Sequence, residues 1–499
     1  LPSTVYYIGE GAFKDCSNLS SVSISGNVDY IPPYAFAGCT SLKSITINSG
    51  VKTIGEKAFN GSMDGSPTIN IPDSVQTIED YAFQDSNVGR LNFNSSSNLG
   101  HIGNYAFYGS ALNTINIPAS VEFIGRYAFR DTGIYNSAST NSFVYINNWA
   151  VDYKGDRSSL DSVSIDGSTK GFASLTFANM QALERVILPA SVNYIGDHAF
   201  YMCYNLEKVM VLTSTVATAG KGIYNNVKNG DHEVVTYVMQ NQVNNYKAAQ
   251  NWENYDNYID SIAVVNISKQ TGGNIINGSS GYYFPDEGMA LQVSYNQGYY
   301  FTGWWSGASV LNRSKAYTYT TQRGDQTILA KFNAIDVNNI NETFNNAIVP
   351  ASFNPISGYN SLITYSTGAV APINAGSHTA TIEVRCTALN NEVVGEKTIA
   401  INISKRTLYI TPQANPITYG DDPPASYNMQ TDNVAPNDSV TVNVTGSCDY
   451  QKYDDVGAYD IYVKAADQTF SHNNYTPQYQ TGTLIVNKKK VTLSIAVVG

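Results

Sequence analysis

The chain has 499 residues, more than one hydrophobic core usually supports, so several domains or an elongated repeat array are expected. Only 14% of the residues are charged and the net charge is −11, which excludes the basic surface that binds nucleic acid or an anionic membrane. Uncharged residues must therefore supply most of the polar surface, and 37 tyrosines offer rings suited to flat, adaptable contacts.

A repeat of 22 to 26 residues runs through the first 212 residues. A typical unit has an Ala-Phe pair, an Ile five residues before the Phe, and a run such as Leu19-Ser-Ser-Val22-Ser-Ile24 after it. The alternation predicts one half-buried strand per unit, and stacked units bury a core that no single unit can form. Nine units are expected, marked by Phe13, Phe36, Phe59, Phe83, Phe107, Phe129, residues 149–151, Phe177 and Phe200.

The repeat consensus, Ile-Gly-x-x-Ala-Phe-x-x-Cys-x-x-Leu-x-x-Val-x-Ile-Pro, resembles the BspA-like leucine-rich repeats of bacterial surface proteins. The resemblance covers residues 1 to about 212 and implies a solenoid. Residues 136–170 depart from the pattern, so we expect this coil to bulge. Residues 233–260 predict a strand and a short helix that cap the last coil with Trp252 and Tyr255, as similar segments do in this family.

Residues 261–335 follow a different pattern of strands and turns. The run Gly298-Tyr-Tyr-Phe301-Thr-Gly303-Trp304-Trp305 and the closing strand Thr327-Ile-Leu-Ala-Lys-Phe332 resemble the B-repeat modules of internalins. The resemblance implies a small β-domain. For Trp304 and Trp305 we favour one core side chain and one partly exposed side chain, and a carbohydrate platform is the alternative.

Residues 336–405 and 406–490 are predicted to form a pair of β-domains. The second contains Tyr419-Gly420-Asp421 and resembles MBG domains of the Tyr-Gly-x type, which occur in tandem in bacterial adhesins. The first lacks this motif. Residues 491–499 resemble the start of a further module, with a strand over 491–498. With a solenoid over 1–260, the chain is expected to be mainly β and multidomain, a leucine-rich-repeat solenoid followed by β-sandwich or β-grasp domains in tandem.

Residues that carry chemistry are few. The five histidines lack metal-ligand spacing, and the five cysteines do not suggest a disulfide framework, although a Cys16–Cys39 bridge between neighbouring repeats stays open. Cys203 lies near His198 but occupies the small, buried position of its repeat, so we expect a free buried thiol instead of a catalytic pair. Asp421-Asp422 fits a turn better than a calcium loop. No catalytic residue, metal site or cofactor is expected.

A candidate ligand surface follows from the strand pattern. In each repeat strand, the residue between the two buried apolar positions must face outward. This outward column and its neighbour are mostly small and uncharged but become apolar and basic near the cap, which suits a docking surface; a merely solvated sheet face is the alternative. The candidate residues are Ser23, Thr46, Asn70, Asn92, Asn116, Ser164, Arg185, Ile187, Lys208 and Met210.

These features predict an extracellular, cell-surface adhesin or ligand-binding protein, with the solenoid held on a stalk of β-domains. Its expected partner is a host or bacterial surface protein or glycan, and we expect a monomer without enzymatic activity and without direct membrane insertion. Both ends look cut from a longer polypeptide, so attachment is expected through a segment outside this chain. A structural spacer, or a non-catalytic glycan-binding region of a larger enzyme, is the alternative.

Overall fold

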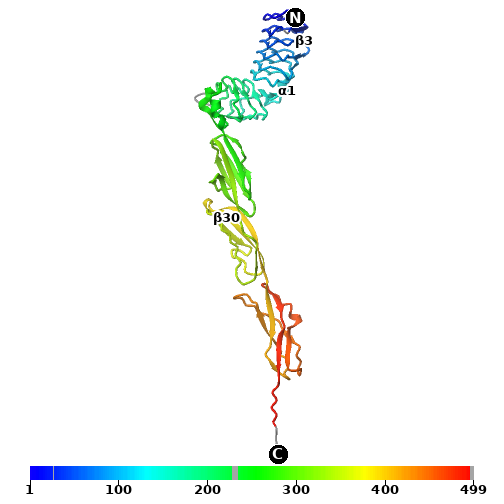
Figure 1. The fold of residues 1–499 in the computed structure, drawn as a ribbon, viewed down its shortest axis with the longest axis vertical. Helices are drawn as coiled ribbons and strands as arrows, with labels where there is room; N and C mark the ends of the chain where they lie inside the picture. Colours follow the sequence, from blue (N-terminus) through cyan, green and yellow to red (C-terminus); the bar gives the residue numbers. More distant parts are fainter. Residues whose placement is uncertain (26, 228–233, 495–499) are drawn as a thin grey trace, which may run out of the picture. The chain divides into compact units, whose positions relative to one another are not determined.

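The computed structural model describes residues 1–25, 27–227 and 234–494 (Figure 1). Strands dominate the chain, and its few helices are short. The chain divides into two compact units. The first unit contains Leu1–Val265, Gly281–Glu287 and Thr320–Gln326, and the second contains Asn266–Ser280, Gly288–Tyr319 and the residues from Thr327 onward.

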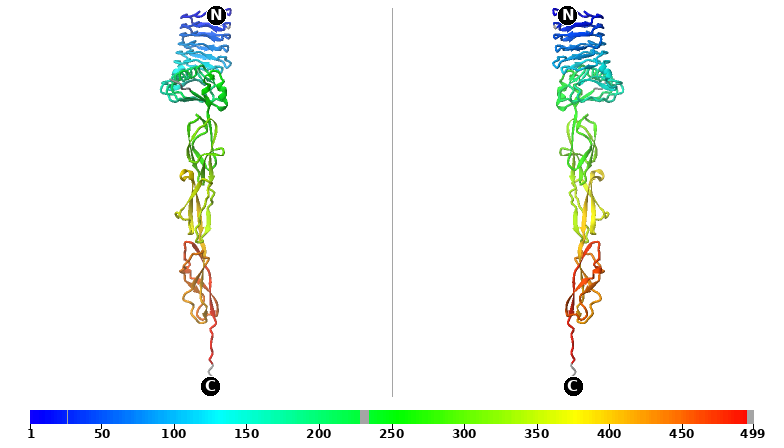
Figure 2. Two further views of the ribbon diagram at one scale, coloured as in Figure 1. Left: turned by 90° about the vertical axis from the view of Figure 1, so that its left-hand side faces the viewer. Right: turned by 90° about the vertical axis from the view of Figure 1, so that its right-hand side faces the viewer.

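The first unit begins with a regular stack of coils over residues 1–131, here called the first stack (Figure 2). One row of strands forms a five-stranded parallel sheet, β10-β8-β6-β4-β2, and a second row is paired as β1-β3 and β5-β7-β9. The strands are β1 Ser21–Ile24, β2 Tyr30–Ile31, β3 Ser44–Ile47, β4 Thr53–Ile54, β5 Thr68–Asn70, β6 Thr77–Ile78, β7 Arg90–Asn92, β8 His101–Ile102, β9 Thr114–Ile115 and β10 Phe123–Ile124.

A ladder of phenylalanine rings runs through the first stack from Phe13 to Phe129. Consecutive rings are stacked, with centroids 5.1 to 5.4 Å apart. The backbone follows the same ladder, because the N–H of each Phe from Phe13 to Phe107 donates to an Ala carbonyl of the next coil, as from Phe36 to Ala58 at 2.8 Å. The Ala-Phe pair therefore provides both the core and the connection between coils.

The regular stack is interrupted after Phe129. Helix α1 (Gly133–Ser137) leads into an antiparallel hairpin of β11 (Ser142–Ile146) and β12 (Trp149–Lys154). The hairpin starts a new sheet, ordered β11-β12-β13-β15-β17, instead of extending the first one, and the pairs from β12 onward are parallel. The expected bulge in residues 136–170 is thus a break between two sheets.

The expected repeat unit at residues 149–151 is wrong for the same reason. Ala150 pairs with Phe172 in the new sheet, so it occupies a strand position and not the turn position of the phenylalanines. Antiparallel pairing of the hairpin fixes these residues as a strand, which the local Trp-Ala-Val pattern does not reveal.

Two arginines and one carboxylate hold this break together. Asp152 is only 3% exposed and accepts hydrogen bonds from Arg130 of the first stack, at 2.8 and 3.1 Å, and from Arg157. Arg157 also donates to the carbonyls of Leu175, Thr176 and Ala178, at 3.1 to 3.3 Å. Because a buried carboxylate needs charged or hydrogen-bonding partners, the triad fixes the second stack against the first. We call Asp152, Arg130 and Arg157 the joint.

The second stack covers residues 171–261. Its strands are β13 Gly171–Phe172, β14 Arg185–Leu188, β15 Tyr194–Ile195, β16 Lys208–Val211, β17 Thr218–Ala219, β18 Val235–Val238 and β19 Ile259–Ser261. The aromatic ladder resumes with Phe177 and Phe200, stacked at 4.6 Å, and continues to Tyr224 at 5.6 Å. The coil of Tyr224 was missed in the sequence, because Ile223-Tyr224 stands where other coils have Ala-Phe.

The segment expected to cap the solenoid forms β18, three short helices and β19. The helices are η1 Gln240–Gln242, α2 Val243–Lys247 and η2 Glu253–Tyr258. Trp252 is fully buried and donates to the carbonyl of Ala217 at 2.7 Å, and the Tyr255 ring packs on Tyr224 at 5.0 Å. These side chains cover the last coil; the expected start of the cap at residue 233 lies outside the described residues.

The strands after the solenoid are β20 Ala263–Lys269, β21 Gly273–Asn277, β22 Gly281–Tyr283, β23 Gly288–Tyr295, β24 Tyr299–Ser306, β25 Ser309–Asn312, β26 Ala316–Thr320, β27 Gly324–Ala334, β28 Ile340–Thr343, β29 Tyr359–Tyr365, β30 Gly376–Cys386, β31 Glu392–Ser404, β32 Arg406–Gln413, β33 Ile417–Thr418, β34 Asn428–Asp432, β35 Gly446–Cys448, β36 Gly457–Val463, β37 Tyr475–Tyr479 and β38 Gly482–Asn487. Single-turn helices η3 (Thr387–Leu389) and η4 (Ala465–Asp467) complete the chain order.

Within the second unit, hydrogen bonds connect neighbouring modules without a free linker. Strand β24 pairs with β31 of the next module, and a side chain in place of Gly395 would overlap Tyr300 there. The Tyr359 hydroxyl donates to the Thr302 carbonyl at 2.8 Å across the same boundary. At the following boundary, only Lys405 separates β31 from β32. Sheet pairing therefore continues from the first of these modules into the second.

The last two modules share a strand order. In residues 406–490 one sheet runs β33-β38-β36-β35, and in 336–405 the corresponding order is β28-β31-β30-β29; β33 and β28 are each parallel to their neighbour. The predicted strand over 491–498 is not formed at residues 491–494, which pair with no described residue, and its remaining residues lie outside the described part of the chain.

Candidate ligand-binding surface and junction pocket

The outward column is exposed along the first stack. Ser23 pairs in register with Thr46, and Asn70 with Asn92, so these side chains follow one another along the strand rows. Asn92 donates to Asn70 at 3.0 Å, and Asn116 accepts from Asn147 at 2.7 Å. All five column residues are exposed, whereas Ser164 lies outside any strand, in the segment between the two stacks. The predicted column is therefore interrupted at the break.

At the second stack the column is covered by its own chain. Met210, expected to face outward, is fully buried in a cluster with Tyr237, Ile262 and Phe284. The Phe284 and Tyr237 rings meet edge to face at 5.6 Å. The expectation of an exposed Met210 is wrong because residues 281–287 fold back onto this end of the sheet, which the alternation of the strand alone cannot indicate.

The two basic candidate residues, which belong to the neighbouring column, bind the same segment. Glu287 accepts from Arg185 at 3.1 Å and from Lys208 at 2.8 Å, and both cations lie over the Phe284 ring. We call Phe284 and Glu287, with the column residues they contact, the clamp. Ile187 stays 47% exposed beside it, so it is the apolar column residue still open to solvent.

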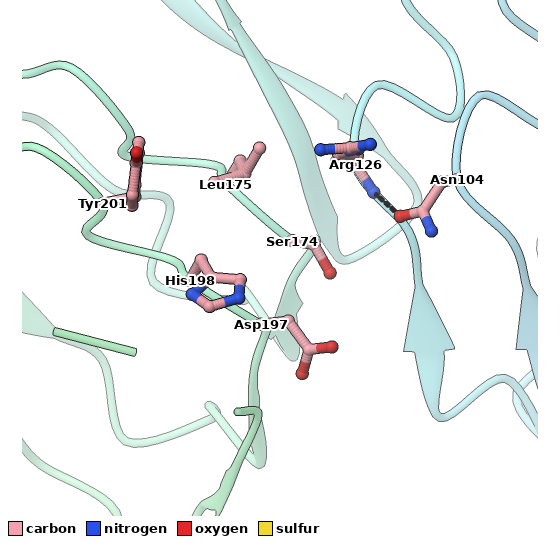
Figure 3. A pocket seen from close by; sticks show the side chains of 7 residues that line it. All are labelled: Asn104, Arg126, Ser174, Leu175, Asp197, His198 and Tyr201. Carbon is pink, nitrogen blue, oxygen red and sulfur yellow. Dashed lines mark hydrogen bonds between the residues drawn. The ribbon is translucent and has the colours of Figure 1, made fainter. Parts of the chain in front are cut away.

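A pocket of about 410 Å³ lies where the two stacks meet (Figure 3). Its walls come from turns that directly follow the two-residue strands: β8 and β10 in the first stack, and β13 and β15 in the second. It is lined by Asn104, Arg126, Ser174, Leu175, Asp197, His198 and Tyr201. We call it the junction pocket.

A side-chain ladder explains why the pocket opens at this place. In the first stack, Asp80 accepts the backbone N–H of Asn104 at 2.6 Å, and Asn104 accepts that of Arg126 at 3.0 Å. The ladder stops at Arg126, because the N–H of Ser174 bonds the Ile124 carbonyl instead. The space that the Asp80 and Asn104 side chains fill within the first stack is therefore left open at the break, and the pocket forms there.

Two polar groups in the pocket have spare hydrogen-bonding capacity. Arg126 lies over the Tyr105 ring at 5.3 Å and forms no ion pair among the described residues. Asp197 accepts the N–H of Lys221 with Oδ1 at 2.7 Å, and Oδ2 has no partner in the described structure. The Nδ1 atom of His198 also lacks a partner there, but it is shielded from solvent. The pocket thus presents one cation and one carboxylate.

Sequence reasoning missed the pocket, but a local signal existed. In each coil, the residue two positions before the aromatic ring of the ladder has a left-handed backbone, which favours Gly. Most coils nevertheless have a large side chain at this position. Neighbouring rings of this row stack, as Tyr81 does on Tyr105 at 5.0 Å. The non-glycine members are Tyr34, Lys57, Tyr81, Tyr105, Tyr127, Leu175 and His198, with φ between 51° and 63°. The row passes through the junction pocket at its Leu175 and His198 end.

The other residues singled out in the sequence take structural roles. Cys203 is fully buried, donates to the Phe177 carbonyl, and burial raises the pKa of its thiol to about 12. All five cysteines are free, and Cys16 is exposed. Asp421 accepts the N–H of Thr418 at 2.9 Å, as a turn residue does. The described residues contain no group of His, Cys, Asp or Glu placed to hold a metal ion.

The two tryptophans of β24 differ in their burial. Trp304 is fully buried and donates to the Ser314 carbonyl at 3.2 Å. Trp305 is half-buried, and Lys331 covers its ring at 4.2 Å. One core and one partly exposed tryptophan, as favoured from the sequence, is the arrangement observed. Among the described residues, no helix has both the length and the apolar character to cross a membrane.

The fold and its repeated turns define the class of the protein: a leucine-rich-repeat solenoid followed by small β-domains. Family comparison identifies the modules. The BspA type leucine rich repeat region matches in six copies over residues 6–136 and 150–246. The divergent InlB B-repeat domain matches residues 263–336, and the MBG domain of the YGX type matches residues 408–485. The assignment of 336–405 as a further MBG domain stays a prediction.

Solved structures with similarity to this chain include three bacterial proteins. A leucine rich cell surface protein from Faecalibacterium prausnitzii is 21% identical, covering 49% of this chain and 88% of its own, with a TM-score of 0.21. A leucine-rich repeat protein from Bacteroides ovatus is 21% identical over 48% and 83%, with a TM-score of 0.17. The pneumococcal vaccine antigen PcpA is 14% identical over 48% and 77%, with a TM-score of 0.21. No curated protein matches the sequence.

The chain thus carries BspA-type leucine-rich repeats, a divergent InlB B-repeat domain and an MBG domain. This combination of modules fits a bacterial cell-surface protein.

Proposed function

We propose that the chain is the ligand-binding part of a bacterial cell-surface protein, an adhesin whose solenoid binds a surface protein or glycan of the host or of another bacterium. The observation that carries the proposal is the clamp. One end of the outward column already binds a peptide segment, residues 281–287, through Arg185, Lys208 and Met210. The part of the outward column on the other side of the break, in the first stack, is exposed at Ser23 and Thr46.

The β-domains act as the stalk in this proposal. Strand pairing between β24 and β31 and the single residue between β31 and β32 support a spacer that keeps its modules in register. A side-chain contact adds to this at the last boundary, where Asn474 accepts the N–H of Ala375 at 2.9 Å. A spacer without loose linkers holds a binding surface at a fixed distance from its attachment.

Binding without catalysis is part of the proposal. Cys203 and His198 are the pair considered as nucleophile and base. Catalysis by this pair is disfavoured because the pKa of the Cys203 thiol is raised to about 12 and the thiol donates to the buried Phe177 carbonyl. A thiolate is the reactive form of cysteine, and burial in apolar surroundings suppresses it. We take the chain to act as a monomer.

The test uses the whole chain, because cutting near residue 260 would expose Met210 and Tyr237 of the clamp cluster. The 499-residue chain is applied to arrays of glycans and of surface and matrix proteins. For any ligand found, the double variant Thr46→Arg with Ile187→Asp should weaken binding at least ~10-fold, about 1.4 kcal/mol, if the outward column docks it.

The matched control is Ile276→Asp on β21, an isoleucine that is 59% exposed outside the solenoid. It should leave affinity unchanged. Equal binding by the column variant and the wild type would reject the outward column as the docking surface. Absence of any ligand on the arrays would favour the structural-spacer alternative, and binding confined to glycans would favour the glycan-holding accessory region.

A further inference from the structure

We propose that the junction pocket binds the carboxylated pyranose unit of an acidic glycan, such as a uronic acid residue. The inference rests on the proposed function, because it names a ligand class for the solenoid, but it concerns a different site from the outward column. The pocket's volume of about 410 Å³ lies at the lower end of the range for small-molecule sites, about 300–1,000 Å³.

The charges in the pocket select a ligand with one negative charge. Arg126 has a guanidinium without a carboxylate partner, and this group binds carboxylates through two parallel hydrogen bonds. Asp197, with its free Oδ2, lines the same pocket and opposes further negative charge. A phosphate dianion or a polysulfate is therefore disfavoured, whereas a single carboxylate next to neutral donors suits both groups.

The remaining accessible polar atom selects a hydroxyl group. Asp197 Oδ2 needs a donor. Two other polar side chains of the lining are not available, because the Ser174 hydroxyl donates to the Ile124 carbonyl at 3.4 Å and His198 Nδ1 is shielded from solvent. A pyranose ring presents hydroxyls beside its carboxylate, so it can donate to Asp197 while its carboxylate binds Arg126.

An aromatic and an aliphatic side chain complete the lining. Tyr201 meets the His198 ring edge to face at 6.3 Å, and Leu175 lies on the same side of the pocket in Figure 3. Such surfaces suit the C–H face of a sugar ring. A small free amino acid would match Arg126 and Asp197 but leave the Tyr201 and Leu175 surfaces uncovered, which makes it the weaker candidate.

The experiment titrates the full chain with methyl glucuronoside and methyl galacturonoside and follows saturation-transfer NMR and calorimetry. Methyl glucoside, the same ring without the carboxylate, is the matched ligand control. We expect the uronosides to bind at least ~10-fold more tightly than the glucoside. Arg126→Gln should remove that preference, and Asp197→Asn, which keeps an oxygen for the Lys221 N–H, should weaken both sugars.

Arg90→Gln, an exposed arginine on β7, controls for loss of a positive charge elsewhere and should change nothing. The proposal is overturned if no uronoside binds up to about 10 mM, or if Arg126→Gln binds like the wild type. It is also overturned if glycine, alanine or an acidic peptide binds the pocket more tightly than the uronosides do.

The two proposals fail separately. Loss of array binding in the column variant with intact uronoside binding supports both sites. Array binding that depends on Thr46 and Ile187, without any uronoside binding, overturns the pocket alone. Uronoside binding that depends on Arg126, with no effect of the column variant on array binding, overturns the outward column alone.

Discussion

The two stacks of the solenoid use the same repeat but end in different ways. In the first stack Phe13 stacks on Phe36, and the stack stops where a hairpin replaces the next coil. The second stack is closed at both ends, by that hairpin and by Trp252 of the cap. Each stack has its own buried cluster. The comparison shows that apolar residues extend a stack, whereas polar clusters and caps decide where it ends.

The comparison also locates the polar features of the solenoid. Inside a stack, each side chain of the Asp80 and Asn104 row satisfies the backbone of the next coil. At the break this arrangement cannot continue, so Arg126 and Asp197 keep capacity for another partner. Arg126 and Asp197 thus have unused capacity because they lie at an irregularity of the repeat.

The largest effect is expected inside a stack. Phe83→Ala removes a fully buried ring that stacks on both neighbours, and we expect a loss of about 3–5 kcal/mol in the free energy of unfolding. Phe13→Ala, which removes a half-buried ring stacked on Phe36, should cost clearly less. Denaturant unfolding measures the loss, and hydrogen exchange should show it in β4 to β10 but not in β13 to β17. Loss of protection in both stacks would show that they form one cooperative unit.

A smaller effect is expected at the joint. Asp152→Asn leaves Arg130 and Arg157 without a carboxylate partner. We expect the free energy of unfolding to fall by about 3 kcal/mol, because removing one partner leaves buried charges unpaired. Asp166→Asn, an exposed aspartate of the same segment, is the control and should stay within about 0.5 kcal/mol. Unfolding midpoints and hydrogen exchange in β11 and β12 report the change. Similar losses for the two variants would mean that the triad does not hold the stacks together.

The smallest effect concerns pH. Burial lowers the pKa of His101, against the nearby carboxylates of Asp80 and Asp197, and its ring stacks on Phe123 at 4.4 Å. The folded protein then binds the proton more weakly than the unfolded chain, so His101 destabilises the fold as pH falls below about 6.5 and has no such effect above it.

His101→Gln should therefore reduce the fall in melting temperature between pH 7.5 and 5.5, by a few degrees at most. Phe123→Ala, which exposes the ring, should act in the same direction while retaining the histidine. Thermal unfolding at several pH values measures both variants. If the melting temperature of both variants falls with pH as steeply as that of the wild type, His101 is not the cause of the loss of stability at low pH.

The sequence by itself determined the architecture of the solenoid and most of its core. The Ala-Phe spacing identified the coils of Phe36 and Phe177, and Trp252 was recognised as a capping residue, because these roles depend on apolar residues at a fixed period. The outward direction of Ser23 and Thr46 follows from the same alternation. Such features are local, so a single strand and its neighbours in sequence contain them.

The tertiary structure decided where regularity ends. Met210 has the pattern of an exposed residue, but Phe284, more than seventy positions away, covers it. Ala150 has the pattern of a turn, but antiparallel pairing places it in a strand. The junction pocket joins Arg126 to Asp197 across the break, and its two walls come from coils whose relative placement depends on Asp152. These outcomes depend on contacts between distant segments, and hydrophobic periodicity holds no information about which segments will meet.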